Sequence, residues 1–210
     1  MDDRSGVRAT YERIAAHFST TREYAWPEVE SFCAGRRADT ALDVGCGNGR
    51  HADVLAGHAE RVVGLDASRA LLSAARRRVP DADLLEGDAS SLPIAGDTVG
   101  LAVYVATLHH LPSRGLRRRS LDELARVLTA DGVGLVSAWS TAHDRFEAGI
   151  DADSGFDTEV DWTLPGGETV PRYYHIYAPA EFDADLGASD LAVVESFLSS
   201  GNCYAVVEPA

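Results

Sequence analysis

The sequence predicts an α/β fold built on a mostly parallel seven-stranded sheet, with an antiparallel edge and helices on both faces. Short apolar runs alternate with helical stretches between Thr40 and Val136, a glycine-rich turn follows the first of these runs, and two more strand-like runs close the chain. Strand–helix–strand repeats of this kind place successive strands in parallel and cover both sides of the sheet.

Each element has local support in the sequence. Five strands are expected at 41–44, 61–65, 83–87, 98–105 and 132–139, with helices near 50–57, 68–79 and 115–128. Ser68 stands where a side chain can cap the second of these helices. A short helix near 179–186 precedes two runs, 191–198 and 203–208, which we expect to pair antiparallel at one edge of the sheet.

Segments before and after the strand–helix core are expected to form additional elements. Val7, Tyr11, Ile14 and Phe18 fall on one helical face, and Pro27 can open a second helix at its first position. We therefore expect residues 1–34 to form N-terminal helices on the substrate side of a single domain that spans 1–210. Residues 141–171 begin with an acidic stretch of little apolar periodicity, which indicates an exposed, mobile insertion or lid.

The charge is unusual, because 33 acidic residues face 19 basic ones, every one an arginine, for a net charge of −14. This composition favours a halophilic, archaeal source with molar intracellular salt; an ordinary acidic protein from a GC-rich genome is the alternative. Acidity normally opposes nucleic-acid binding. At molar salt the Debye length is only ~3 Å, so net charge does not decide that question.

The apolar runs and the cysteines indicate where the protein works and whether it binds a metal. No stretch of eighteen apolar residues and no apolar signal segment occur, so we expect a cytoplasmic protein. Cys33, Cys46 and Cys203 lie far apart, which fits neither a disulfide framework nor a zinc site, and we expect no metal in this chain.

The run LDVGCGNGR, residues 42–50, predicts a ligand loop. Its three glycines allow a sharp turn and close approach of a ligand. Acidic residues end successive strands: one before the glycines can attract an ammonium, the next can bind both ribose hydroxyls, and the third can accept from an adenine amino group. The residues expected to bind the cofactor are Asp43, Gly45, Cys46, Gly47, Asn48, Gly49, Asp66, Ala67, Asp88 and Ala89.

An adenine, a free ribose and an amino-acid end, without a phosphate, match S-adenosylmethionine better than NAD, and the glycine spacing departs from GxGxxG. Over about residues 35–140 the chain resembles a class I methyltransferase with its Rossmann-like fold. That resemblance implies S-adenosylmethionine as cofactor and S-adenosylhomocysteine as product. The run LHHL, with His109 and His110, is also typical of this class.

Outside that core, three further segments resemble the tRNA wobble-uridine methyltransferases, which form the methyl ester of 5-carboxymethyluridine. The matching motifs are Tyr11 with IA.HF in the first helix, then Thr21-Arg22 and Trp26-Pro27, and finally RYYH at 172–175. The chain departs from the family pattern at 23–25, where a basic residue is usual, and in its acidic insertion.

The resemblance implies roles on the substrate side. Arg22 and Arg172 would hold the substrate carboxylate, while His109, His110 or His175 would donate further hydrogen bonds. Tyr11, Trp26, Tyr173 and Tyr174 would contact the base, as aromatic rings do in single-stranded loops. Arg114, first in RGLRRRS, would contact phosphates of the anticodon stem. The competing interpretations are an edge strand for RYYHIY, a salt bridge to Glu23 or Glu28 for Arg22, and a solvated helix face for RGLRRRS.

A carboxylate substrate is already ionised above pH ~5, so no general base is needed. The resemblance also implies a small zinc-binding activator protein as a heterodimer partner, which we expect along the edge strand Asp83–Gly87. Two rival functions remain open from sequence: a small-molecule methyltransferase, and a non-catalytic subunit that binds the cofactor.

Overall fold

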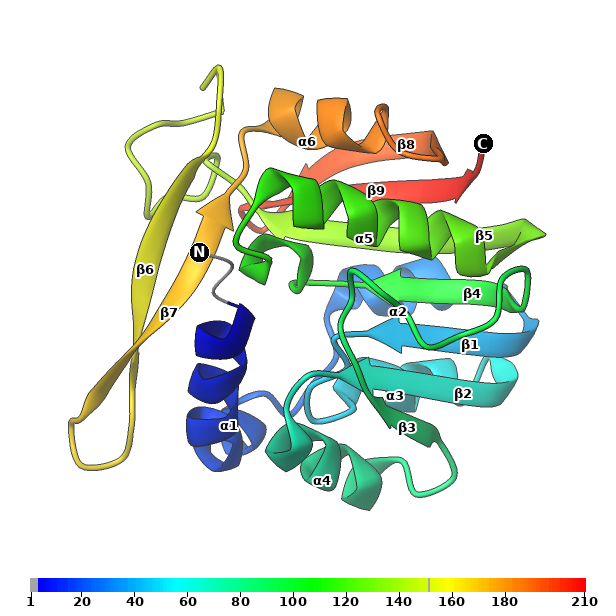
Figure 1. Cartoon of the computed structure of the whole chain (residues 1–210), viewed down its shortest axis with the longest axis horizontal. Helices are drawn as coiled ribbons and strands as arrows, with labels where there is room; N and C mark the ends of the chain where they lie inside the picture. Colours follow the sequence, from blue (N-terminus) through cyan, green and yellow to red (C-terminus); the bar gives the residue numbers. More distant parts are fainter. Residues whose placement is uncertain (1–3, 151) are drawn as a thin grey trace.

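The computed structural model describes residues 4–150 and 152–210; residues 1–3 of the N-terminal segment and residue 151 of the insertion lie outside it. The main sheet has seven strands in the order β3-β2-β1-β4-β5-β9-β8 (Figure 1). Its parallel strands are β1 (Ala38–Val44), β2 (Ala59–Asp66), β3 (Asp83–Glu86), β4 (Val99–Tyr104) and β5 (Leu128–Trp139). The predicted α/β fold with a mostly parallel sheet is confirmed.

The last two strands close one edge of the sheet. β9 (Asn202–Pro209) pairs antiparallel with β5, and β8 (Leu191–Ser199) pairs antiparallel with β9. The predicted antiparallel edge is therefore confirmed. β3 forms the opposite edge, as the sequence predicts for 83–87.

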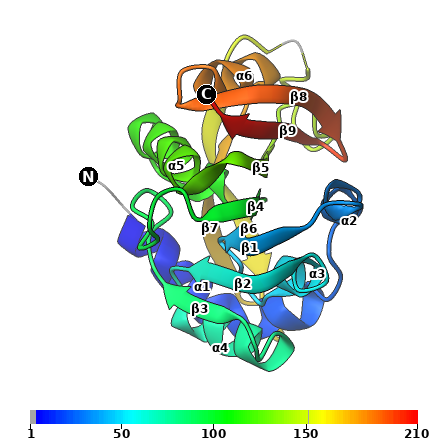
Figure 2. The same ribbon diagram turned by 90° about the vertical axis from the view of Figure 1, so that its right-hand side faces the viewer.

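Helices cover both faces of the sheet (Figure 2). On one face α5 (Arg114–Val127) and α6 (Pro179–Leu186) contribute leucines and Phe182 to an apolar cluster with residues of β1, β4, β5 and the last two strands. On the other face α2 (Pro27–Cys33), α3 (Arg50–Leu55) and Val79, which follows α4 (Arg69–Arg78), form a cluster with Leu101, Val103 and Leu135. Ser68 caps α4, since its Oγ accepts from the backbone N–H of Leu71 at 3.2 Å. Two apolar layers thus hold the sheet rigid.

Two further elements lie across the carboxyl ends of the strands, at the left in Figure 1. They are α1 (Arg4–Thr21) and a separate two-stranded antiparallel hairpin, β6 (Phe156–Thr163) with β7 (Thr169–Ile176). Ile14 of α1 packs on Trp162 of β6 and Val170 of β7. Helix and hairpin therefore form one cap, which we call the α1–hairpin cap.

Residues 141–171, expected to be an exposed insertion or lid of little apolar periodicity, contain β6 and the start of β7. In β6, buried Val160 and Trp162 alternate with exposed Glu159 and Asp161, so one strand face is apolar and the other acidic. The high acidic content hid this two-residue period. Among the described residues, no helix is long and apolar enough to cross a membrane.

Candidate active site

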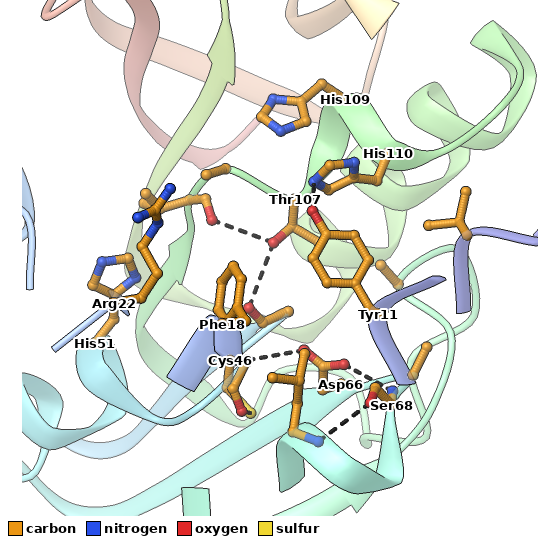
Figure 3. A pocket seen from close by; sticks show the side chains of 18 of the residues that line it. Tyr11, Phe18, Arg22, Cys46, His51, Asp66, Ser68, Thr107, His109 and His110 are labelled. Carbon is orange, nitrogen blue, oxygen red and sulfur yellow. Dashed lines mark hydrogen bonds between the residues drawn. The ribbon is translucent and has the colours of Figure 1, made fainter. Parts of the chain in front are cut away.

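A cavity of about 1010 Å³ lies between the carboxyl ends of β1–β5 and the α1–hairpin cap. Figure 3 shows its walls: Asp66 and Ser68 on one side, Arg22 and His51 on another, and His109 and His110 above them. Open α/β sheets bind ligands at this edge. Most of the residues singled out from the sequence line it: Tyr11, Arg22, Trp26, Gly45, Cys46, Gly47, Asn48, Asp66, Ala67, Asp88, Ala89, His109, His110, Arg172 and Tyr174.

The glycine loop forms the floor of this cavity. Gly45 and Gly47 have positive φ angles of 74° and 54°, a region that side chains rarely adopt. A Cβ at Gly45 would lie 2.7 Å from the Cβ of Thr107, so only glycine allows the loop to pass this residue. At Gly47 an added Cβ would meet only Phe18, at 3.6 Å, because the loop backbone faces open space there. Gly49 instead starts α3 and packs on Ala75 of α4, away from the cavity.

Asp66 organises the loop from the neighbouring strand. Its Oδ2 accepts from the N–H of Gly47 and its Oδ1 from the N–H of Ser68, both at 2.8 Å. Burial raises its pKa to about 6. Asp88, after β3, accepts from the N–H and hydroxyl of Ser90, each at 2.8 Å. Both carboxylates therefore stand in fixed positions on the cavity wall.

Asp43 lies beneath the loop, not on the cavity wall. Its side chain is 1 % exposed, and its Oδ2 has no hydrogen-bond partner among the described residues. Burial raises its pKa to about 7, and nearby Asp66 adds to the shift. Asn48 links the loop to the end of α1, because its Nδ2 donates to the carbonyl oxygen of Arg22 at 2.8 Å.

The two histidines come from the 3₁₀ helix Leu108–His110. His110 Nδ1 lies 2.9 Å from the carbonyl oxygen of Tyr173, which can only accept, so this nitrogen carries the proton. Its Nε2 then accepts from the Tyr11 hydroxyl at 2.7 Å. His109 Nδ1 accepts from the backbone N–H of Trp139 at 2.9 Å, which leaves Nε2–H as a donor. Burial lowers the pKa of His110 to about 3 and that of His109 well below its ordinary value, so both rings are neutral.

Strand β7 divides its residues between two faces. Arg172 and Tyr174 line the cavity, whereas Tyr173 and His175 face the other way. The Arg172 guanidinium lies 4.8 Å from the ring centre of Trp162 and 5.1 Å from that of Tyr174. Arg172 is only 8 % exposed, and its Nε has no partner among the described residues. No carboxylate of the described residues forms an ion pair with it.

Arg22 reaches the same indole from α1. Its guanidinium lies 5.2 Å from the Trp162 ring and 5.9 Å from that of Phe18. Trp162 thus lies against two guanidinium groups, and its Nε1 donates to His17 Nδ1 at 3.1 Å. Trp26 in turn lies 5.2 Å from the Arg50 guanidinium.

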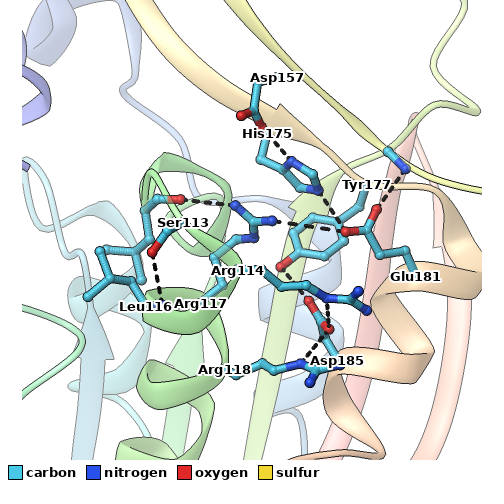
Figure 4. Close-up of polar contacts among 12 residues, drawn as sticks. Ser113, Arg114, Leu116, Arg117, Arg118, Asp157, His175, Tyr177, Glu181 and Asp185 are labelled. Atoms are coloured by element: carbon cyan, nitrogen blue, oxygen red, sulfur yellow. Dashed lines mark hydrogen bonds and ion pairs between the residues drawn. The ribbon is translucent and has the colours of Figure 1, made fainter. Parts of the chain in front are cut away.

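Tyr173, His175 and Arg114 do not line the cavity. His175 and Arg114 instead lie among acidic residues on the side of α5 and α6, as Figure 4 shows. His175 bonds Asp157 at 2.7 Å and Glu181 at 3.1 Å through its two ring nitrogens, so neither faces a ligand. The Tyr173 hydroxyl donates to the carbonyl oxygen of Pro112 at 3.4 Å. These residues join the hairpin to α5 and α6.

Arg114 pairs with a residue of α6. Its Nε lies 2.7 Å from Asp185, whose side chain is 1 % exposed, and Arg118 binds the same oxygen at 2.8 Å. Arg117 lies 4.0 Å from Glu181 of α6, so the cluster RGLRRRS holds α6 on α5 with three of its arginines, as Figure 4 shows.

Several residues in or beside the cavity were not predicted from the sequence. Trp162, which packs against Arg22 and Arg172, lay in the stretch expected to be an exposed insertion or lid, although its alternation with acidic neighbours was a usable signal. Arg50 follows the glycines directly and could have been noted as a cation beside a ligand loop. Trp139, His143, Asn202 and Tyr204 come from β5, its following turn and β9, and no local pattern marks them.

Comparisons with known proteins agree with this geometry. Residues 42–136 match the family model described as "Methyltransferase domain". Among solved structures, a DhpI–SAH complex superposes with a TM-score of 0.72 at 18% identity, covering 98% of this chain and 96% of that one. A complex of the Haloferax volcanii Trm112 methyltransferase activator with a putative methyltransferase gives 0.73 at 17% identity, over 97% of each chain. Fold and glycine-loop site together define a Rossmann-like methyltransferase domain.

Curated relatives carry related names. A putative methyltransferase of Encephalitozoon cuniculi is 32% identical, covering 84% of this chain and 85% of its own. The tRNA (carboxymethyluridine(34)-5-O)-methyltransferase of Saccharomyces cerevisiae is 31% identical over 79% of this chain, which spans 59% of that relative's length. The Schizosaccharomyces pombe protein of that name is 24% identical, with 96% and 95% covered. The chain belongs to the class I S-adenosylmethionine-dependent methyltransferases.

The cavity residues fit S-adenosylmethionine. The cofactor carries a positive sulfonium and an ammonium, and the site offers a buried carboxylate oxygen of Asp43 without a partner beneath the loop. The loop backbone at Gly47 faces open space, and the fixed carboxylates of Asp66 and Asp88 follow on adjacent strands. Acceptors of this kind suit ribose hydroxyls and an adenine amino group.

Proposed function

We propose that this protein methylates the carboxylate of 5-carboxymethyluridine at the wobble position of tRNA, forming a methyl ester. The names of the yeast relatives support this substrate. The structural observation that carries the proposal is the Arg172 guanidinium, buried in the cavity without a carboxylate partner among the described residues. A buried, unpaired cation costs free energy unless an anion binds it, so the site favours an anionic substrate.

Arg22 supplies the second half of the proposed carboxylate site. Both guanidinium groups pack against the Trp162 indole, at 5.2 and 4.8 Å, so they converge on one part of the cavity. Planar guanidinium groups bind carboxylates with two hydrogen bonds, and the neutral His109 can add a donor from Nε2. Tyr174 and Trp26 offer rings on which an unstacked base can lie.

The chemistry suits a substrate that needs no proton removed. When bound, S-adenosylmethionine supplies a sulfonium methyl group, to which a carboxylate oxygen can bond as the bond to sulfur breaks and S-adenosylhomocysteine leaves. His110 uses both ring nitrogens, and the one lone pair of His109 accepts from Trp139, so neither ring can take a proton. What the chain supplies is orientation at about 3–3.5 Å and a dry cavity under the α1–hairpin cap. We therefore expect kcat to be nearly flat from pH 6 to 9 at saturating cofactor.

Because the protein has a net negative charge, it gains no long-range attraction to the phosphates of tRNA. We propose that direct contacts bind the tRNA instead. We propose that the protein works in the cytoplasm of a halophilic archaeon as a single domain, with a small zinc-binding activator protein as its partner. The open edge at β3 supports a place for that partner, since an unpaired strand can pair with another chain. The solved Trm112 complex supports an activator of this kind. Residues 141–171 are proposed to close the cavity as part of a lid.

The deciding experiment is methyl transfer from radiolabelled S-adenosylmethionine to tRNA from a strain blocked at this step, in molar KCl, with and without the activator. We expect label that mild alkali releases, because methyl esters hydrolyse readily. Alkali-stable label on tRNA would exclude ester formation. No transfer to tRNA with the activator present would overturn the tRNA proposal and favour a small-molecule acceptor.

A further inference from the structure

A second group of polar residues gathers at the side of the cavity formed by α2, α3 and β9. It comprises Trp26, Arg50, His51, Asn202 and Tyr204, all of which line the cavity. In Figure 3, His51 lies on the same side as Arg22 and far from His109 and His110. None of the roles assigned above uses Arg50 or His51, so the chemistry of this side is open.

Arg50 is a partly buried cation on the cavity wall. Its guanidinium packs on the Trp26 ring at 5.2 Å, and no carboxylate of the described residues forms an ion pair with it. Burial lowers its pKa to about 10, and the positive charge of Arg22 adds to that shift. An arginine in this state gains when an anion enters.

His51 provides an independent sign of a missing ligand. Its side chain is 4 % exposed, and its Nε2 is buried with no hydrogen-bond partner among the described residues. Burial lowers its pKa to about 3, so the ring is neutral and carries one N–H. Buried polar nitrogens are normally paired, so this one is available to a bound group.

The position of Arg50 and His51 relative to the glycine loop indicates which anion they bind. Asp88, Asp66 and Asp43 follow one another along adjacent strands, from the adenine end of the proposed cofactor path to its ammonium end. Arg50 follows the loop directly and interacts electrostatically with Asp43. A negative and a positive group side by side match the two charges of an α-amino acid.

We propose that Arg50, assisted by His51, binds the α-carboxylate of the methionine moiety of S-adenosylmethionine. This inference rests on the use of the cofactor and does not depend on a tRNA substrate. It assigns three of the arginines that line the cavity to two anions: Arg50 to the cofactor, Arg22 and Arg172 to the substrate.

The test compares two ligands by titration calorimetry, with no tRNA present. One is S-adenosylhomocysteine; the other is 5′-deoxy-5′-(3-aminopropylthio)adenosine, which keeps the amine but lacks the carboxylate. We expect wild-type protein to prefer the first by about 10-fold or more, as for a charge-assisted hydrogen bond. Arg50→Met should reduce this preference to about 3-fold or less, and Arg50→Lys should retain most of it.

Arg22→Met is the matched control, because it removes a neighbouring cation of the same cavity. We expect it to keep the preference of the wild type. The proposal would be overturned if Arg50→Met kept the preference for S-adenosylhomocysteine. It would also be overturned if Arg50→Met and Arg50→Lys each lost affinity for the two ligands by the same factor. If Arg50→Met keeps the preference and, in a separate titration, binds tRNA more weakly than wild type, Arg50 contacts the nucleic acid instead.

Discussion

The two arginine groups of this protein differ in one respect, the presence of a carboxylate within the fold. Arg114 and Arg118 on α5 share the buried Asp185 at 2.7 and 2.8 Å. Arg172 and Arg50 line the cavity, and no described carboxylate pairs with either. A paired arginine stabilises the fold, whereas an unpaired one in a cavity is available to a ligand.

Arg172→Met gives the strongest test of this difference. We expect kcat/KM for the tRNA substrate to fall about 100- to 1,000-fold, since a buried partner of the substrate carboxylate is lost. Affinity for S-adenosylhomocysteine should change less than about 3-fold. Steady-state kinetics and calorimetry measure the two quantities. Equal losses in both would mean that Arg172 supports the fold of the cavity and does not bind the substrate.

The double variant Arg114→Met/Arg118→Met tests the other group. It leaves Asp185 buried without a cation, so we expect the free energy of unfolding to fall by about 3 kcal/mol. Arg114→Met alone should cost less than about 1 kcal/mol, because Arg118 still binds the same oxygen. Denaturant unfolding measures both. A stable double variant with strongly reduced tRNA binding would restore the phosphate-binding role predicted from sequence.

The buried carboxylates predict that cofactor affinity depends on pH. In the ligand-free protein, burial raises the pKa of Asp43 to about 7 and that of Asp66 to about 6. A cationic cofactor favours their ionised forms, so affinity should rise about 10-fold between pH 5.5 and 8, with proton release on binding. Calorimetry in two buffers of different ionisation enthalpy counts these protons. Binding without proton release at pH 6 would contradict the account.

Asp43 and Asp66 should lower the free energy of unfolding as pH rises, whereas cofactor affinity should increase. Their folded-state pKa values lie above the unfolded ones, so the stability they contribute is complete below about pH 4 and is lost as pH rises through 6 and 7. Without ligand this contribution should therefore decline from pH 5 to 8. Saturating cofactor should reduce the decline in a thermal-unfolding series.

Tyr11→Phe should have the smallest effect. It removes the hydroxyl that donates to His110 Nε2 at 2.7 Å, while the bond from Nδ1 to Tyr173 stays. We expect kcat to fall about 2- to 5-fold, because His110 is held less firmly. Steady-state kinetics measure this. A loss above about 100-fold would mean that the Tyr11 hydroxyl contacts the reacting groups directly.

The periodicity of apolar residues and the residues that begin or end helices and strands predicted most of the fold. All five parallel strands, the helices between them and the antiparallel strands of the tail occur where the sequence places them, because burial on both faces leaves a strong local pattern. The hairpin was missed because its outer face is acidic, so Val160 and Trp162 were the only signal in β6. The glycine loop was predicted for the same reason as the strands: its geometry is local.

The site was less predictable where it depends on contacts far apart in sequence. The motif RYYH places four residues together, but strand alternation sends Arg172 and Tyr174 into the cavity and Tyr173 and His175 away from it. Which face meets the cavity depends on how the hairpin packs on α1. Likewise, Arg114 cannot be distinguished from a phosphate-binding arginine until Asp185 is seen beside it.

The central claim is that Arg172, which has no carboxylate partner among the described residues, binds the carboxylate of the substrate. The most direct measurement is the affinity of two anticodon stem-loops, one with 5-carboxymethyluridine and one with its neutral amide, 5-carbamoylmethyluridine, in the presence of the activator and S-adenosylhomocysteine. The account predicts that wild-type protein binds the acid at least about 10-fold more tightly and that Arg172→Met loses this preference. Equal binding of acid and amide by the wild type would contradict it.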